Sequence, residues 1–315
     1  MQKILKFLQT TPFRGAHSSI VSADASFRKY YRLQHNNTSY ILMDTSLEKD
    51  TLAPFLDITN KLHRCSVYAP KIYYEELQNG YLILEDFGDV NLLDKLTQEN
   101  FEHYYKQAID TIVKMQQADT TNLPLYDKAF LHQEMALMQE WYLEKKLSLT
   151  LSQAQQRMLH TTLESIANTV LSQPQEVFVH RDFHSRNIML TPSGALGIID
   201  YQDAMCGAVT YDLVSLLKDC YIAFDRDKIE TLALHLKERL ALDATPKEFL
   251  KWFDFTGMQR HIKVLGIFSR LHLRDGKDGY LKDIPLTRSY LIKTASRYNE
   301  TQALAEFLRE FGCRR

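Results

Sequence analysis

The residues best able to do chemistry lie between positions 180 and 200. The segment His180-Arg181-Asp182-Phe183-His184-Ser185-Arg186-Asn187 is followed, thirteen residues after Asn187, by Asp200 at the end of an apolar pair. A loop carboxylate can orient a hydroxyl group and accept its proton. An amide oxygen and a second carboxylate can together hold a hard cation such as Mg²⁺. Phosphoryl transfer requires this combination of groups.

The elements around this segment explain how separate positions would meet. Asn187 to Thr191 and Ala195 to Asp200 favour two strands, and the Pro-Ser-Gly between them favours a turn. An antiparallel hairpin places Asn187 beside Asp200, with Asp182 on the loop that enters it. The alternative is a buried strand pair with polar loop residues. Four fixed residue types at one spacing arise by chance with a probability of about 10⁻³, which favours the chemical interpretation.

The rest of the chain divides into two regions. Before residue 90, strands are expected at 27–33, 39–44, 71–75 and 81–85, and a helix at 52–62. After it, helices are expected at 99–117, 128–145, 152–172, 212–223, 226–240, 246–274 and 287–311. We therefore expect an α+β fold with a small antiparallel β domain over 1–88 and a larger, mainly helical domain over 89–315 that contains the hairpin.

Composition narrows the class of protein further. The 315 residues are 45% hydrophobic and 24% charged with a net charge of -1, which gives no electrostatic reason to expect nucleic acid or an anionic membrane as partner. No run approaches about 18 apolar residues, and the N-terminus is too short and polar for a signal peptide. The four cysteines form no C-x-x-C pair, which is typical of a cytoplasmic protein. No obligate protein partner is indicated.

The segment from His180 to Asp200 resembles the catalytic core of the aminoglycoside phosphotransferase and choline kinase group, small-molecule kinases with a protein-kinase-like, two-lobed fold. The resemblance implies ATP as phosphoryl donor, Asp182 as the catalytic residue, and Asn187 with Asp200 as Mg²⁺ ligands. Protein kinases fit less well, because Tyr-Gln-Asp rather than Phe-Gly follows Asp200. The few residues before Asp212 also leave no room for an activation segment.

Longer strings resemble the anomeric sugar kinases of bacterial peptidoglycan recycling. These strings span 24–33, 40–44, 84–88, 199–204, 210–221 and 259–271. The resemblance implies ATP-dependent phosphorylation of the 1-hydroxyl of N-acetylmuramate and N-acetylglucosamine. Two alternatives stay open: another small-molecule kinase of the same superfamily, and a non-catalytic, pseudokinase-type binding protein.

The nucleotide side departs from the usual kinase pattern. Met43 stands where a third-strand lysine is expected, and no glycine-rich loop precedes it. Either the small domain no longer binds nucleotide, or the backbone amides of Ser26 and Phe27 contact the phosphates together with Arg28 or Lys29. We favour the second interpretation, because a metal site without nucleotide would have little purpose.

Other polar residues have both a structural and a functional interpretation. The resemblance implies that the backbone of Glu85-Asp86-Phe87 binds adenine, whereas the alternative is a linker without ligand. Asp203 either contacts a sugar or caps a turn. Arg181 and His184 either meet an anionic substrate or pair with local acids. Asp212 is expected to be a helix N-cap, while the resemblance implies that it braces the catalytic loop.

A basic stripe marks the helix expected near the C-terminus. Arg260, Lys263, Arg270 and Arg274 fall within an arc of about 80°. The simpler interpretation is a solvated helix face. The alternative is that Arg260 and Lys263 line the substrate site and receive the lactyl carboxylate of N-acetylmuramate. The same basicity argues against polycationic aminoglycosides, which require an acidic pocket.

Overall fold

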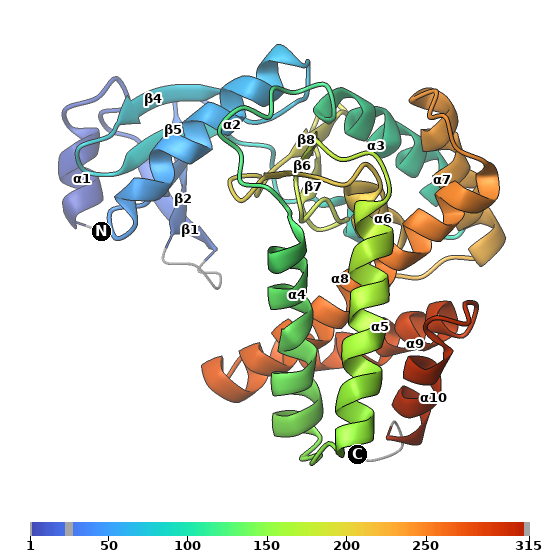
Figure 1. The fold of residues 1–315 in the computed structure, drawn as a ribbon. Helices are drawn as coiled ribbons and strands as arrows, with labels where there is room; N and C mark the ends of the chain where they lie inside the picture. Colours follow the sequence, from blue (N-terminus) through green and yellow to red (C-terminus); the bar gives the residue numbers. More distant parts are fainter. Residues whose placement is uncertain (1, 23–27, 312–315) are drawn as a thin grey trace. The chain divides into compact units, whose positions relative to one another are not determined.

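The computed structural model describes residues 2–22 and 28–311. They form two compact units, one of residues 1–92 with 187–202, the other of residues 93–186 with 203–315 (Figure 1). The sequence-based boundary at residue 88 lies close to the first junction. The hairpin segment, which we expected within the larger domain, belongs to the first unit.

An antiparallel five-stranded sheet forms the centre of the first unit, in the order β1-β2-β3-β5-β4. Its strands are β1 (His17–Ser22), β2 (Lys29–His35), β3 (Thr38–Asp44), β4 (Ile72–Glu76) and β5 (Tyr81–Glu85). Alternate side chains of the sheet, such as Leu33, Leu42 and Ile83, are fully buried in a cluster with helix α1 (Gln2–Leu8). Helix α2 (Leu52–Arg64) follows η1 (Lys49–Thr51) and buries Phe55, Ile58 and Leu62.

The hairpin joins this unit through both of its strands, β7 (Ile188–Leu190) and β8 (Leu196–Ile198). The amide of Leu190 donates to the carbonyl of Val90 at 2.8 Å, and the amide of Ile198 donates to the carbonyl of Tyr68 at 2.8 Å. Gly197 is required here, because a Cβ at this position would lie 2.5 Å from the ring of Phe87. These bonds explain why residues 187–202 group with the sheet.

The second unit is mainly helical. Its elements are α3 (Phe101–Met115), α4 (Lys128–Leu137), the π-helical η3 (Met138–Lys146), α5 (Gln153–Leu171), β6 (Val177–Val179), β9 (Met205–Gly207), α6 (Tyr211–Leu217), α7 (Arg226–Arg239), α8 (Pro246–Asp275), η4 (Asp278–Asp283), α9 (Ile284–Ala295) and α10 (Gln302–Glu310). The short 3-10 turn η2 (Leu92–Asp94) stands at its start. Strands β6 and β9 pair antiparallel and flank the chemically interesting loop.

Helix α8 is the central element of this unit. It begins with Thr245 as N-cap and Pro246 in the first turn, and it ends at Gly276 in the left-handed conformation. It contacts η3, α4, α5, α6 and α9. Because neighbours surround it, nearly every side chain between Phe249 and Ser269 is buried, polar ones included.

Most of the expected elements are confirmed, with differences at several boundaries. The helix expected over 287–311 is two helices, because the chain turns after Ala295 and the hydroxyl of Thr301 donates to the Ala295 carbonyl at 2.8 Å. The helix expected over 212–223 ends at Leu217. Within the described residues, the short elements α1, β1, β6 and β9 and the 3-10 turns η1, η2 and η4 were not expected. Each has seven residues or fewer, too short for a clear periodic pattern.

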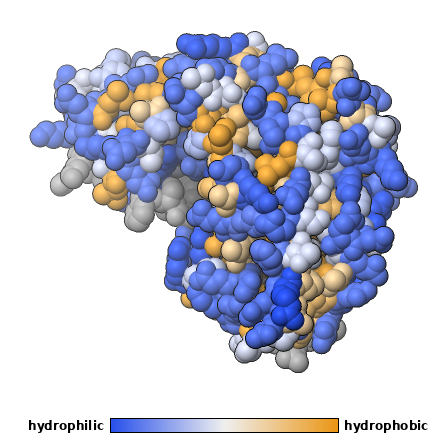
Figure 2. All heavy atoms as spheres, in the orientation of Figure 1, coloured by the Kyte–Doolittle hydropathy of each residue, from blue (hydrophilic) through white to orange (hydrophobic). Residues whose placement is uncertain are grey.

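Hydrophilic residues cover most of the face drawn in Figure 2, and the apolar ones form small separate groups. None of the helices within 2–22 and 28–311 is long and apolar enough to span a membrane.

Candidate active site

The loop that follows β6 is anchored by a buried carboxylate. One oxygen of Asp212 accepts from the amide of His180 at 2.8 Å, and the other from the amide of Arg181 at 3.0 Å. Arg181 has a φ of 75°, and these bonds hold it in that left-handed conformation. Burial raises the pKa of Asp212 to about 6, despite the opposing influence of His180. The N-cap prediction for Asp212 was therefore wrong: Thr210 occupies that position, and Asp212 braces the loop.

A second carboxylate, Asp219, anchors the far end of the loop. It accepts from the amide of Ser185 at 3.0 Å and from the Ser185 hydroxyl. Between the anchors, the amide of Asp182 donates to Nδ1 of His180 at 3.3 Å, so the His180 side chain also holds the loop. The backbone of Asp182 is therefore fixed from several directions, which is how an enzyme positions a reacting group.

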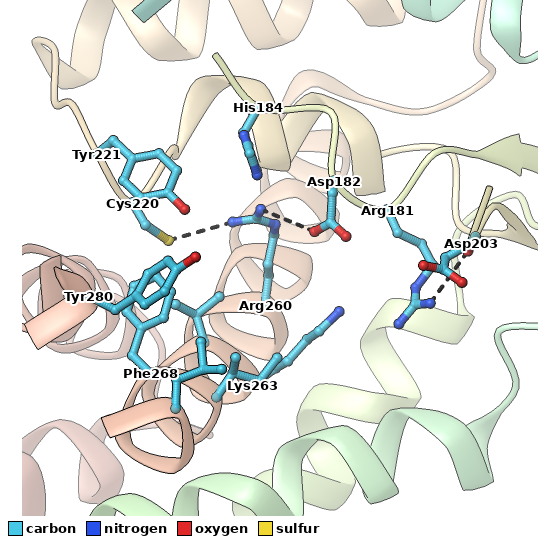
Figure 3. A pocket seen from close by; sticks show the side chains of 13 residues that line it. Arg181, Asp182, His184, Asp203, Cys220, Tyr221, Arg260, Lys263, Phe268 and Tyr280 are labelled. Carbon is cyan, nitrogen blue, oxygen red and sulfur yellow. Dashed lines mark hydrogen bonds and ion pairs between the residues drawn. The ribbon is translucent and has the colours of Figure 1, made fainter. Parts of the chain in front are cut away.

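Asp182 opens into a cavity of about 290 Å³ within the second unit (Figure 3). The five side chains predicted to bind substrate all line the same cavity: Arg181, His184, Asp203, Arg260 and Lys263. The sequence analysis missed the remaining lining residues, which are Cys220, Tyr221, Val264, Ile267, Phe268, Leu271 and Tyr280. Because the Asp182 side chain is 44% exposed, a ligand in the cavity can reach its carboxylate.

Positive charge surrounds the Asp182 carboxylate. Arg260 Nη2 lies 4.0 Å from Asp182 Oδ1, and Lys263 follows one turn later on α8. The partial enclosure of Asp182 in the pocket would raise its pKa, but neighbouring cationic groups, Lys263 foremost, outweigh this effect and lower the pKa to about 2. Burial lowers the pKa of His184, whose ring lies at 82° to that of Tyr221. At neutral pH the pocket thus presents an ionised Asp182 and an uncharged imidazole.

A buried glutamate beneath the cavity holds two of its cations. Oε1 of Glu134 lies 2.8 Å from Arg181 Nη2 and 2.9 Å from Lys263 Nζ. Its other oxygen accepts from Gln259 at 3.1 Å and from the hydroxyl of Tyr126. Burial would raise the pKa of Glu134, yet Lys263 and the bond from Tyr126 lower it. The sequence analysis missed Glu134, although a charged residue between Leu131 and Met135 at core spacing was the available signal.

The basic stripe of α8 divides into a buried and an exposed part. Arg260 is 4% exposed and Lys263 is 7% exposed, so the solvated-face interpretation was wrong for these two residues. It holds for Arg274, which is exposed and pairs with Asp275 at 2.7 Å. Arg270 is half-buried.

In the first unit, the hairpin brings the two expected metal ligands together. Nδ2 of Asn187 lies 3.2 Å from Oδ2 of Asp200, and Nε2 of Gln202 donates to Oδ1 of Asp200 at 2.9 Å. Asp200 is exposed and has a φ of 65°. No cluster of three or more His, Cys, Asp or Glu side chains suited to a metal occurs among the described residues. Mg²⁺ bound with nucleotide needs only one or two protein oxygens, so an adjacent carboxylate and amide fit it.

The structure describes only some of the residues that we expected to bind nucleotide. Ser26 and Phe27 lie outside the described residues. Arg28 is buried at 6% exposed, whereas Lys29 is exposed at the start of β2. Met43 is fully buried, so this side chain belongs to the core.

The segment expected to bind adenine is tied into the sheet. The amide of Glu85 donates to the Lys71 carbonyl at 2.8 Å, so this group is already used and cannot also bind a base. The Asp86 carboxylate forms a bidentate ion pair with Arg32, at 2.6 and 3.1 Å, and accepts a hydrogen bond from the Gly88 amide at 2.9 Å. These side chains fix the segment, and Phe87 packs on the hairpin at Gly197.

Comparison with known proteins identifies a family and several relatives of this chain. The model of a family described as "Phosphotransferase enzyme family" matches residues 18–247. An N-acetylmuramate/N-acetylglucosamine kinase of Neisseria meningitidis is 35% identical, with 98% of this chain and 95% of that protein covered. A kinase of the same name from Pseudomonas aeruginosa is 34% identical, with 91% and 86% covered.

The fold has relatives among solved structures. ADP-bound aminoglycoside phosphotransferase APH(2'')-Ib superposes with a TM-score of 0.59 at 16% identity, covering 91% of this chain and 95% of that one. This similarity confirms the expected α+β, protein-kinase-like fold. With the family model spanning most of the sequence and relatives above 30% identity along nearly its whole length, the chain belongs to the phosphotransferase enzyme family.

Proposed function

We propose that this protein is an ATP-dependent sugar kinase that phosphorylates the anomeric 1-hydroxyl of N-acetylmuramate, N-acetylglucosamine or both. The observation that carries the proposal is the Asp182 carboxylate, fixed on its loop and opening into a cavity that two buried cations of α8 also line. The names of the relatives at 34–35% identity support the choice of sugars.

In the proposed reaction, the sugar oxygen bonds to the γ-phosphorus of ATP. The bond from that phosphorus to the oxygen bridging the β- and γ-phosphates breaks, and ADP leaves. Asp182 accepts a hydrogen bond from the 1-hydroxyl, orients it, and takes its proton. Arg181, His184 and Asp203, which line the same cavity, bind and orient the sugar.

Asn187 and Asp200 would hold Mg²⁺ bound to the nucleotide. The ion neutralises charge on the phosphates when bound. Asp182 precedes Asn187 by five residues, so their Cα atoms lie within about 18 Å of each other along any path of the chain. Use of ATP, together with the free thiols of Cys65, Cys206 and Cys220, favours the cytoplasm as the place of action.

A substrate panel tests the proposal. The purified protein is supplied with Mg²⁺-ATP and either N-acetylmuramate, N-acetylglucosamine, kanamycin or choline, and the product is identified by phosphorus and proton NMR. We expect a sugar 1-phosphate from one or both amino sugars. The cationic lining of Arg181, Arg260 and Lys263 disfavours kanamycin and choline, which are themselves cationic. A 6-phosphate, or turnover of kanamycin or choline alone, would reject the proposed reaction.

The role of Asp182 is tested separately. Asp182→Asn should lower kcat by about 10²–10⁴-fold while nucleotide binding, measured by calorimetry, is kept. The matched control is Asp243→Asn, which removes an exposed carboxylate in the turn after α7 and should leave kcat unchanged. Turnover near the wild-type rate in Asp182→Asn would refute the assignment.

A further inference from the structure

The three cations that line the cavity differ in how they are neutralised. Arg181 and Lys263 share one oxygen of Glu134, at 2.8 and 2.9 Å. Glu134 is 6% exposed and has its second oxygen occupied by Tyr126 and Gln259. The charges of Arg181 and Lys263 are therefore directed at a partner inside the protein and are only partly available to a ligand.

Arg260 is neutralised much less completely. It is 4% exposed, and within residues 2–22 and 28–311 its guanidinium hydrogen-bonds only the sulfur of Cys220, at 3.6 Å. The nearest carboxylate is Asp182, at 4.0 Å, beyond hydrogen-bond distance. A guanidinium carries five donors and stays charged at every working pH. A buried guanidinium with one weak hydrogen bond needs a further anionic partner, and the cavity is where that partner can enter (Figure 3).

The same face of α8 changes from charged to apolar along its length. Arg260, Val264, Phe268 and Leu271 follow one another at helical spacing, and all of them line the cavity. The ring of Phe268 stacks on that of Tyr280, with centroids 5.1 Å apart. A ligand that fits this face has an anionic group next to methyl groups. The lactyl ether of N-acetylmuramate is a carboxylate one carbon away from a methyl, and N-acetylglucosamine lacks it.

We propose that Arg260 is the residue that binds the lactyl carboxylate and thereby distinguishes N-acetylmuramate from N-acetylglucosamine, with the lactyl methyl against the apolar part of α8. This inference rests on the proposed sugar-kinase function. Lys263 and Arg181, held by Glu134, serve both sugars equally. Of the two buried cations of α8, Arg260 and not Lys263 recognises the acid.

The experiment compares kcat/KM for the two sugars in Arg260→Gln, Lys263→Gln and Arg274→Gln. Loss of a charge-assisted hydrogen bond should lower kcat/KM of Arg260→Gln for N-acetylmuramate about 10- to 100-fold more than for N-acetylglucosamine. Lys263→Gln should lower both values by the same factor. Arg274→Gln removes an exposed arginine of the same helix and should change neither.

A change of substrate gives a second readout that does not depend on how well a variant folds. The methyl ester of N-acetylmuramate keeps the lactyl carbons but lacks the charge. For wild-type protein, kcat/KM of the ester should be about 10- to 100-fold below that of the free acid, and Arg260→Gln should abolish this difference.

The outcomes separate the inference from the function on which it rests. Wild-type protein that phosphorylates neither sugar refutes the proposed function. Wild-type protein that uses both sugars, with Arg260→Gln affecting them equally or with Lys263→Gln carrying the selective loss, overturns the assignment to Arg260. Equal use of acid and ester by wild-type protein overturns it as well.

Discussion

Asp212 makes the stability of this protein depend on pH in a way that one substitution can isolate. Asp212 is 1% exposed, and its carboxylate accepts hydrogen bonds from the backbone amides of His180 and Arg181. Burial raises the pKa of Asp212 from 3.8 to about 6. The folded state therefore binds this proton more tightly than the unfolded chain does. The resulting stabilisation is complete below the unfolded pKa and is lost as the pH rises through about 6.

The size of the effect follows from the shift. A change of about two pKa units corresponds to about 3 kcal/mol, and a little under half of it, about 1.4 kcal/mol, falls between pH 5 and pH 8. Asp212→Asn removes the titration and also one of the two accepted hydrogen bonds, because an amide has a single oxygen. The lost bond lowers the free energy of unfolding by an amount that does not depend on pH. The gap between wild type and variant should therefore narrow by about 1.4 kcal/mol from pH 5 to pH 8.

Urea unfolding of both proteins at half-unit steps of pH measures this gap. Protonation of Asp212 should also loosen the loop that carries Asp182, because a protonated carboxyl group accepts the hydrogen bonds from the two loop amides less well. We expect the kcat of wild-type protein to fall below about pH 6, and this acid limb to be absent in Asp212→Asn, whose kcat is lower throughout. A gap that stays constant with pH, or an acid limb of unchanged midpoint in the variant, would refute the reasoning.

Two further predictions concern the interior of the second unit. Glu134→Gln leaves Arg181 and Lys263 without their shared carboxylate, so it should lower the free energy of unfolding by about 3 kcal/mol. It should also lower kcat/KM for every accepted sugar. Denaturant unfolding and steady-state kinetics measure these two effects, and wild-type values in both would contradict the prediction. Gly266→Ala places a Cβ 2.4 Å from the backbone of Leu137, so it should lower the free energy of unfolding by about 1–3 kcal/mol in a urea titration. The control is Gly279→Ala. Its Cβ would meet nothing within 4 Å, so the same titration should show little change in the free energy of unfolding.

The catalytic motif was predictable from the sequence because its members are neighbours in the chain. Asp182 and Asn187 share one loop, and the hairpin that pairs Asn187 with Asp200 spans few residues. Local rules on strands and turns are enough to bring such residues together. Asp219 and Glu134 were missed for the opposite reason. Asp219 follows its partner Ser185 by 34 residues, and Glu134 precedes Arg181 by 47, so packing alone determines these pairs.

The basic stripe shows where a helical-wheel argument fails. A wheel divides a helix into an apolar core face and a polar solvent face, which holds only when one side of the helix meets water. Helix α8 is enclosed by other helices, so Arg260 and Lys263 are buried although they lie opposite Met258 and Ile262. The signal for this enclosure was the middle of the helix, where Arg260 and Lys263 are the only Lys, Arg, Asp or Glu residues between Phe255 and Ser269. The two buried cations, Arg260 and Lys263, line the cavity and so indicate where it lies.

The charge around Asp182 defines what this residue can contribute to phosphoryl transfer. Because the surrounding cations lower its pKa to about 2, Asp182 is ionised at pH 7 and is a weak base. So weak a base does not ionise a sugar hydroxyl in advance, and it takes the proton only once the bond from oxygen to phosphorus is forming and the hydroxyl has become strongly acidic. Until then its contribution is to hold the hydroxyl in line, which is the main requirement of a loose phosphoryl transition state. Lys263 and Arg260 therefore both keep Asp182 ionised and ready to orient the hydroxyl, and Arg260 suits a second task, because it also faces the acidic group of the substrate in the proposed assignment.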